Sequence, residues 1–207
     1  MNESRVENTE PSLAVRLVQV ALELLAEEGI EALTLRSLAR RAGVSHAAPA
    51  RHFRSLSDLR AEVAATGFRL LSEAIERSDT ALLPAGGPMP RLAAAGRAYV
   101  ECALANPGLF ALMFRTGDLD PDNESLMRDS RAAFERLLEH VRRAQAAGWR
   151  AERDSSLLAG SMWASVHGLA TLWAEGAYQG AIPRASLEDA LTTALELTVD
   201  TRQGESK

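Results

Sequence analysis

Residues 34–60, TLRSLARRAGVSHAAPARHFRSLSDLR, read as two short helices joined by a tight turn and followed by the start of a longer helix. Thr34 is expected to cap the first helix, because its hydroxyl can accept from a first-turn amide that has no intrahelical partner. Gly43 is expected to end that helix, since glycine adopts the left-handed conformation without a Cβ clash. Ser45 is expected to cap the second helix, over residues 46–52. A helix, a Gly-containing turn and another helix form a helix-turn-helix.

The expected second helix is suited to the major groove of DNA. Small side chains at its exposed start let the backbone approach the base edges, while cations reach the phosphates on the groove walls. We predict that four residues face the groove, namely Ser45, His46, Ala47 and Ala48. The predicted phosphate contacts are Thr34, Arg36, His52 and Arg54. A further residue, Arg51, could make either kind of contact.

The charge distribution favours DNA binding by this unit. Residues 34–60 hold six Arg against one acid, Asp58, which gives a local net charge of +5 in a chain whose net charge is −5. Neutralising phosphates releases counterions and gives a salt-dependent affinity for DNA. A solvated basic face on an ordinary helical hairpin is the alternative. Charge alone does not separate the two interpretations, and the helix-turn-helix pattern favours the first.

Residues 24–71 resemble the DNA-binding domain of the TetR family of one-component transcriptional regulators. The matching positions, which run without a gap, are Ala26 to Gly29, Leu33 to Arg36, Leu38 to Ser45, Arg51 to Phe53, Ser55, Asp58 and Leu59. The chain departs from the family at Ala50, where a Tyr often touches a phosphate, and at Leu56, where a Lys often opens the next helix. Pro49 falls in the first turn of the expected recognition helix or just beyond it, where a missing N–H costs least but a local distortion is possible.

The composition points to a helical globular protein. At 207 residues with 46% hydrophobic content, the chain is long enough for one domain or two. Ala and Leu dominate, which favours helix, and no apolar run approaches the roughly 18–20 residues that a membrane helix needs. The polar, acidic start reads as a disordered tail over residues 1–11, not as a signal peptide. A single cysteine, Cys102, fits a reducing cytoplasm, and we expect it to pack in the core instead of acting as a redox sensor.

The hydrophobic periodicity predicts an all-α protein of about nine helices with no strand. The expected helices cover residues 12–28, 34–42, 46–52, 55–79, 90–105, 107–114, 124–148 and 154–177, with a last one opening at Ser186. Asn106 is expected to cap the helix that starts at Pro107. The Pro- and Gly-containing residues 82–90 form the best boundary. We therefore expect a DNA-binding domain over residues 12–80, including the start of a connecting helix, and a second domain over residues 81–207.

A further resemblance concerns this second domain. Residues 163–170, WASVHGLA, resemble a TetR-family C-terminal domain type named after a Trp-His-Gly pattern, and residues 106–114 resemble a segment of the same type. In the family, the last two helices of each subunit form a four-helix dimer interface, and the helices before them enclose an effector pocket. The resemblance thus implies a homodimer that binds a small molecule. The candidate pocket residues are Tyr99, Phe110, Met113, Phe114, Phe134, Trp163 and His167.

Other functions find less support in the residues. A His beside a Trp on one helix face, or a group of Phe and Met, is commonly part of the core. The four His are scattered without a Cys/His pairing at ligand spacing, so we expect no metal and no cofactor. Catalysis would need convergent titratable groups, and no catalytic motif places them, so we expect no enzyme. The remaining alternative is a DNA-binding or assembly factor that lacks effector control.

These observations predict a cytoplasmic, homodimeric repressor that binds a palindromic operator in double-stranded DNA. Two recognition units related by a two-fold axis require an inverted repeat. A small hydrophobic effector is expected to favour a conformer whose recognition units no longer match their half-sites, which releases the operator. Repression, as opposed to activation, follows from the family resemblance alone.

Overall fold

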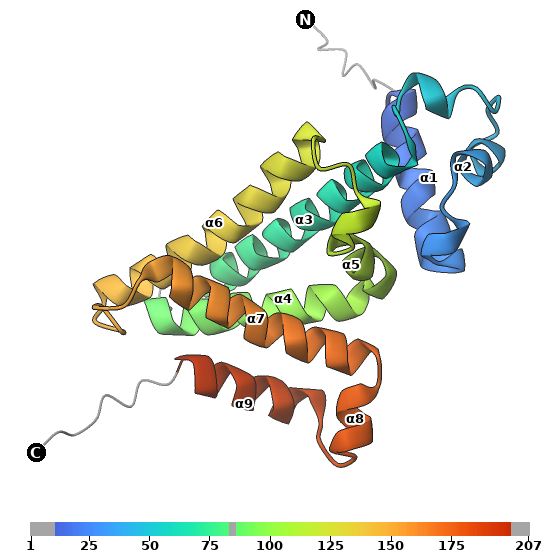
Figure 1. Ribbon diagram of the computed structural model, residues 1–207. Coiled ribbons are helices and arrows are strands. Elements are labelled where there is room, and N and C mark those ends of the chain that lie inside the picture. The colour runs from blue at the N-terminus through green and yellow to red at the C-terminus, as the bar shows by residue number, and fades with distance from the viewer. Residues whose placement is uncertain (1–10, 83–85, 200–207) are drawn as a thin grey trace, which may run out of the picture.

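The computed structural model describes residues 11–82 and 86–199 of the chain. Within these residues it holds nine α-helices, three short 3-10 helices and no strand, which confirms the all-α class. The α-helices are α1 (Leu13–Glu28), α2 (Leu35–Arg41), α3 (Leu56–Ala81), α4 (Pro88–Ala105), α5 (Pro107–Met113), α6 (Glu124–Ala146), α7 (Ser155–Ala174), α8 (Ala177–Ala181) and α9 (Leu187–Val199). In Figure 1, α1 and α2 lie at one end, and α3 runs from them into the bundle that it forms with α4 and α6.

Local capping defines the helices of the first unit, a name used here for α1, α2 and the chain that follows them up to the start of α3. Ser12 accepts from the Val15 N–H at the start of α1. At the start of α2, Thr34 Oγ1 accepts from the Ser37 N–H at 3.0 Å, and the Thr34 N–H donates to Ser37 Oγ at 3.0 Å, which forms a capping box. Gly43 has a φ of +67°, so α2 stops there through a left-handed residue. The predicted cap at Thr34 and the predicted stop at Gly43 are confirmed.

The predicted second helix of the motif, residues 46–52, is wrong. The chain forms turns there and one 3-10 helix, η2 (Pro49–Arg51). In an α-helix capped by Ser45, residue 49 would be the first to donate its N–H to the Ser45 carbonyl, and proline has no N–H. The Ala48 N–H donates to that carbonyl instead, at 2.9 Å, and closes a tighter turn. The distortion that Pro49 made possible therefore extends over the whole segment.

α3 is a continuous helix of 26 residues that connects the two parts of the chain. Ser55 caps it by accepting from the Asp58 N–H at 3.1 Å; Ser55 and Asp58 form the S-x-x-D pattern that commonly starts a helix. Leu59 near its start is buried beside the first unit, and Ile75 near its end is buried in the bundle. One continuous helix therefore belongs to both regions.

Three details of the C-terminal half differ from expectation. α7 ends at Ala174, and Gly176, with a φ of +73°, turns the chain into the separate helix α8. The Asn106 side chain does not cap α5; its Nδ2 donates to the Cys102 carbonyl at 3.0 Å, in the last turn of α4. α6 ends at Ala146, slightly earlier than expected. The helix count of nine agrees with the prediction because α8 makes up for the missing helix in the motif.

One apolar core joins the motif to the bundle. It includes Leu24 of α1, Leu59 of α3, Val100 of α4, Leu112 of α5 and Leu191 of α9, each at most 1% exposed. A second, smaller cluster lies where α4, α6 and α7 meet, and it contains Leu92, Leu138, Val141, Trp149 and Met162. Since the first core continues from the motif into the bundle, a change of packing in the bundle can reach the motif.

Two expectations concern the ends and the division of the chain. The predicted tail lies outside the described residues except for residue 11. The division at residues 80–81 stays a prediction, because α3 packs on the first unit and on the bundle. Among the described helices, none combines the length and the apolar character that crossing a bilayer requires.

Candidate DNA interface and ligand cavity

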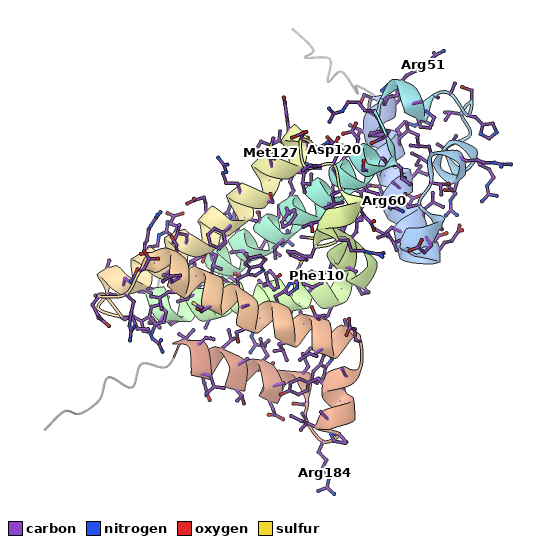
Figure 2. All side chains as sticks on the ribbon, viewed as in Figure 1. Arg51, Arg60, Phe110, Asp120, Met127 and Arg184 are labelled. Atoms are coloured by element: carbon purple, nitrogen blue, oxygen red, sulfur yellow. The ribbon has the colours of Figure 1, made fainter. Side chains whose placement is uncertain are left out.

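The residues predicted to contact DNA lie at the surface of the first unit. All are exposed except Ala48, which is half-buried: Thr34, Arg36, Ser45, His46, Ala47, Arg51, His52 and Arg54. Arg51 projects from the outer end of the molecule (Figure 2). Pro49 is fully buried and Phe53 is only 4% exposed, so their rings fix the segment between them to the core. The segment is thus held by side-chain burial together with the hydrogen bonds of the short 3-10 helix η2.

Two arginines of the basic stretch, residues 34–60, are held by acids outside that stretch. Arg41 on α2 contacts Glu27 on α1 at 2.6 Å, and Arg60 on α3 contacts Asp118 at 3.8 Å. Neither acid lies within residues 34–60, so the local charge of +5 did not include them. These ion pairs fasten α2 and α3 to their neighbours and reduce the charge that is free to attract DNA.

Arg54 is also engaged. The Arg54 guanidinium contacts Asp120 at 2.8 Å and Asp58 at 3.5 Å. The backbone N–H of Arg54 also donates to Asp58 Oδ2, at 2.8 Å. Burial alone would raise the pKa of Asp58, but hydrogen bonds from Asn123 and Arg54 outweigh it and lower that pKa below its ordinary 3.8. Within the described ranges, the arginines of this unit that lack an acidic partner are Arg36, Arg40 and Arg51.

The loop of residues 115–123, between α5 and α6, is fastened to the first turns of α3. The Asp120 N–H donates to the Ser57 carbonyl at 3.2 Å. Asn123 Nδ2 donates to Asp58 Oδ1 and to Glu62 Oε1, each at 2.9 Å, while Asn123 Oδ1 caps α6. The 115–123 loop therefore holds the start of α3 through a network of polar groups.

A cavity of about 330 Å³ lies among α3, α4, α6 and α7. This volume is at the lower end of the range of about 300–1,000 Å³ for small-molecule sites. Its lining is almost entirely apolar: Phe68, Leu71, Ile75, Leu92, Ala95, Gly96, Tyr99, Met113, Phe114, Thr116, Leu119, Leu126, Ser130, Ala133, Phe134, Leu137, Met162, Trp163 and Val166. Thr116 and Leu119 belong to the 115–123 loop, so the loop that holds α3 also forms part of the cavity wall.

Five of the seven predicted pocket residues line this cavity, namely Tyr99, Met113, Phe114, Phe134 and Trp163. The other two, Phe110 and His167, lie behind that lining. The His167 ring packs against Phe110 and Phe114, with centroid distances of 5.1 and 4.5 Å. They support the wall from outside the cavity.

Tyr99, Trp163 and His167 are joined by hydrogen bonds. Trp163 Nε1 donates to the Tyr99 hydroxyl at 3.1 Å, and that hydroxyl lies 2.9 Å from His167 Nδ1. Burial raises the pKa of Tyr99 and lowers the pKa of His167, which favours the neutral form of both. The tyrosine hydrogen can then be donated to the Nδ1 lone pair, so the three polar groups satisfy one another.

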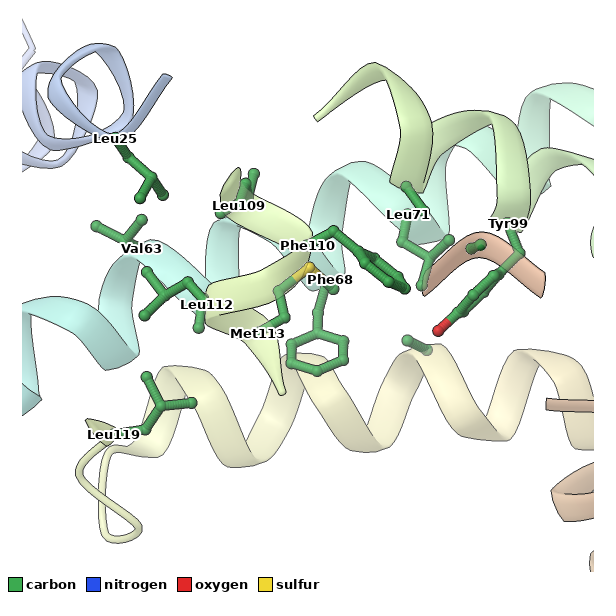
Figure 3. Close-up of a cluster of buried hydrophobic side chains, with 14 of the residues drawn as sticks. Leu25, Val63, Phe68, Leu71, Tyr99, Leu109, Phe110, Leu112, Met113 and Leu119 are labelled. Atoms are coloured by element: carbon green, nitrogen blue, oxygen red, sulfur yellow. The ribbon is translucent and has the colours of Figure 1, made fainter. Parts of the chain in front are cut away.

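α5 makes the second contact between the cavity and the first unit. A Cβ at Gly108 would lie 3.2 Å from the Leu25 carbonyl oxygen of α1, and one at Gly67 of α3 would lie 2.5 Å from Met113 Sδ. α5 therefore packs closely on both helices. Figure 3 shows the apolar side chains that continue from Leu25 past Leu109 to the aromatic rings around the cavity.

Most of the lining could not be identified from sequence. Lining residues such as Leu71, Leu92 and Met162 are of types that commonly fill a helical core, so the sequence does not distinguish them from ordinary core residues. Within residues 11–82 and 86–199, no group of three His, Cys, Asp or Glu side chains is arranged to hold a metal. Cys102 is half-buried, and burial raises the pKa of its thiol, which disfavours the reactive thiolate.

Comparisons with known proteins agree with this arrangement. Residues 17–63 match the family model of bacterial regulatory proteins of the tetR family, and residues 92–197 match a tetracyclin repressor-like C-terminal domain. A structure of a protein of unknown function from Rhodococcus sp. RHA1 is 34% identical, with a TM-score of 0.77 over 94% of this chain and 97% of that one. A search among curated proteins finds no match.

More distant structures share the fold. The TetR family transcriptional regulator PfmR from Thermus thermophilus is 22% identical, with a TM-score of 0.65 over 89% of this chain and 97% of that one. The regulator FadR from Bacillus subtilis, solved in complex with stearoyl-CoA, is 16% identical, with a TM-score of 0.62 over 90% of this chain and 97% of that one. Since models of one family match both halves, the chain belongs to the TetR family of DNA-binding transcriptional regulators and not to a family of enzymes.

Proposed function

We propose that the protein is a cytoplasmic, homodimeric repressor that binds a palindromic operator and releases it when a small hydrophobic molecule enters the cavity. One observation carries the ligand response: two elements of the cavity wall, α5 and the 115–123 loop, also contact the DNA-binding unit. An occupant that displaces either element changes the position of α1 or of the start of α3. Membership of the family supports repression as opposed to activation.

The cavity residues divide into two roles in this proposal. We infer direct ligand contacts for Tyr99, Met113, Phe114, Phe134 and Trp163, which line the cavity. Phe110 and His167 act on the ligand only through the side chains that they support. The alternative, a DNA-binding or assembly factor without effector control, gives no reason for an apolar cavity of this size beside the elements that hold the DNA-binding unit.

For the DNA contacts, we infer that Thr34, Arg36, His52 and Arg54 hold phosphates, and that Ser45, His46, Ala47 and Ala48 face the groove. Arg36 and Arg51 are exposed and lack an acidic partner among the described residues, so both guanidinium groups are available to the DNA backbone. Arg54 can join them only by leaving Asp58 or Asp120. The DNA-facing segment is short, a turn followed by the 3-10 helix η2, so a short run of base pairs suffices for each half-site.

The exposed face of α7 supports dimerisation through the last two long helices. Leu157 and Leu172 are 74% and 46% exposed, and Leu197 on α9 is 74% exposed. Between the two leucines of α7, a Cβ at Gly160 or at Gly168 would meet no atom within 4 Å. Small residues flanked by exposed leucines let a second copy of the helix approach closely, as a two-fold interface requires.

The proposal is tested by selecting bound sequences from random DNA with the full chain, then measuring operator affinity during titration with apolar compounds. We expect an inverted-repeat consensus, a dimer by sedimentation, and loss of operator affinity with compounds that quench Trp fluorescence. A consensus without two-fold symmetry, bound by a monomer, contradicts the dimer. Quenching by a compound that leaves operator affinity unchanged supports the factor without effector control.

A further inference from the structure

The polar groups of the cavity wall are already paired within the protein. The Tyr99 hydroxyl accepts from Trp163 and lies within hydrogen-bond distance of His167. Ser130 Oγ donates to the Leu126 carbonyl at 2.6 Å in its own helix. A ligand that enters therefore meets the side chains of Tyr99 and Trp163 with their polar atoms already engaged, and it finds little hydrogen bonding to gain from them.

No charged side chain is among the described residues that line the cavity. Two arginines next to lining residues in the sequence are also occupied, since Arg69 of α3 contacts Asp129 at 2.6 Å and Arg97 of α4 contacts Glu188 at 2.6 Å. Arg131 of α6 is exposed and does not line the cavity. An ionised group that entered would lose its hydration without gaining a partner, which is strongly unfavourable. The wall thus selects against carboxylates and phosphates.

Thr116 is the exception in this wall. It lines the cavity and is exposed, so it lies where the cavity meets solvent. Its hydroxyl makes no hydrogen bond with another described residue and is free to donate to or accept from one uncharged polar group. A ligand with an apolar body and a single hydroxyl or carbonyl at one end would match this arrangement.

We propose that the effector is an uncharged molecule whose apolar body fills the cavity and whose one polar group, where present, bonds Thr116. This inference rests on the proposed function and narrows it, because it excludes ionised carboxylic acids and acyl-CoA thioesters. The B. subtilis FadR that shares the fold was solved with stearoyl-CoA, whose CoA part carries phosphates. The wall of the present cavity holds no described residue to balance such charge.

The test compares 1-decanol, decanoate and decanoyl-CoA, which share a ten-carbon chain and differ in the polar end. Binding to the full chain is followed by Trp fluorescence at about pH 7.5, where decanoate is ionised because a carboxyl pKa lies near 4. Trp163 is the tryptophan that lines the cavity. We expect 1-decanol to bind at least about tenfold more tightly than decanoate, a difference of 1.4 kcal/mol, and decanoyl-CoA not to compete with it.

Two matched pairs locate the binding. Ala133→Phe fills the cavity from α6 and should weaken 1-decanol binding about tenfold or more, whereas Ala132→Phe, one residue away and exposed, should leave it unchanged. Thr116→Val should weaken the binding of 1-decanol but not the binding of decane. Thermal midpoints of the variants show that each is folded before its affinity is compared.

The outcomes separate the ligand class from the function. Equal or tighter binding of decanoate overturns the proposal, above all where Arg131→Ala abolishes it, since Arg131 is exposed on α6 beside the lining residue Ser130. The proposal is also overturned if 1-decanol does not bind, or if Ala133→Phe leaves its binding unchanged. If 1-decanol binds as expected but leaves operator affinity unchanged, the ligand class stands and the ligand-released repressor is wrong.

Discussion

The two contacts between the cavity and the DNA-binding unit differ in chemistry. α5 meets α1 and α3 through apolar side chains and at two glycines: a Cβ at Gly108 would lie 3.2 Å from the Leu25 carbonyl oxygen, and one at Gly67 would meet the Met113 side chain at 2.5 Å. The 115–123 loop meets α3 through carboxylates, an amide and a guanidinium, and half-exposed Arg115 extends it to Glu31 at 3.6 Å. Each includes residues of the cavity wall at one end, so we propose that an occupant acts on both.

Because one contact is apolar and the other is polar, we expect the α5 contact and the contact of the 115–123 loop to respond differently to mutation, salt and pH. Close-packed apolar contacts tolerate little change of volume and depend little on salt or pH. Ion pairs and charged hydrogen bonds at a partly exposed site weaken as salt screens them and as carboxylates are protonated. We expect α5 to contribute most to stability and the 115–123 loop to make the position of α3 adjustable.

The largest effect is expected at the α5 contact. Gly67→Val places a branched side chain against Met113, and we expect the free energy of unfolding to fall by about 1–3 kcal/mol. Gly117→Val is the matched change in the 115–123 loop, where a Cβ meets no atom within 4 Å, and it should cost less than about 0.5 kcal/mol. Urea unfolding measures both. Equal costs would remove the distinction between the two contacts.

A smaller effect is expected from the polar contact. Asn123→Ala and Asp154→Ala each remove the side chain that caps a long helix, and each should cost about 0.5–2 kcal/mol. Only Asn123 also holds Asp58, so only Asn123→Ala should weaken the operator complex, by up to about tenfold or 1.4 kcal/mol. A mobility-shift titration of both variants decides. The same operator affinity in both would mean that the loop does not position α3.

The pH dependence of stability distinguishes the contacts next. The pKa of Asp58 is lowered on folding, so its contribution is complete above its ordinary value of 3.8 and is lost as pH falls through the lower folded pKa. Asp58→Asn should therefore be less stable than wild type at pH 7 and lose less stability below pH 4. Asp129, whose pKa is also lowered, keeps the variant from becoming pH-independent. Parallel stability curves for the two proteins would refute the assignment.

The smallest effect concerns the salt dependence of DNA binding. Arg51→Ala should reduce the slope of log K against log salt by about 0.9, the value for one phosphate contact. Arg54→Ala should reduce it by less, because Asp58 and Asp120 already hold that guanidinium. Arg184→Ala, on the loop before α9, serves as a control and should not change it (Figure 2). A larger change at Arg54 than at Arg51 would show that DNA displaces the carboxylates.

Local features could be predicted from the sequence, and contacts between distant residues could not. The cap at Thr34, the stop at Gly43 and the cap at Asp154 each depend on groups within a few residues. The loss of the helix at 46–52 was also local, and the missing N–H of Pro49 was its signal. Its consequence was underestimated because the matching family segment is helical.

The sites depend on pairs far apart in the chain. Tyr99 and His167 are 68 residues apart, and Arg54 and Asp120 are 66 apart. Helical periodicity indicates which face of a helix is buried but not which helix it meets. The aromatic lining residues were proposed from the family resemblance, and most of the aliphatic lining residues were missed. A local count of charge likewise treated Arg54 as free, because Asp120, its second acidic partner, lies in the 115–123 loop.

The bond between Arg54 and Asp120 has a thermodynamic consequence. If a phosphate takes Arg54, Asp120 loses its cationic partner, and the loop that forms part of the cavity wall loses one of its contacts with α3. Linkage is reciprocal: if occupancy of the cavity lowers operator affinity by some factor, operator binding lowers affinity for the effector by that same factor. The sensitivity of the sensor in a cell would then depend on how much DNA competes for it.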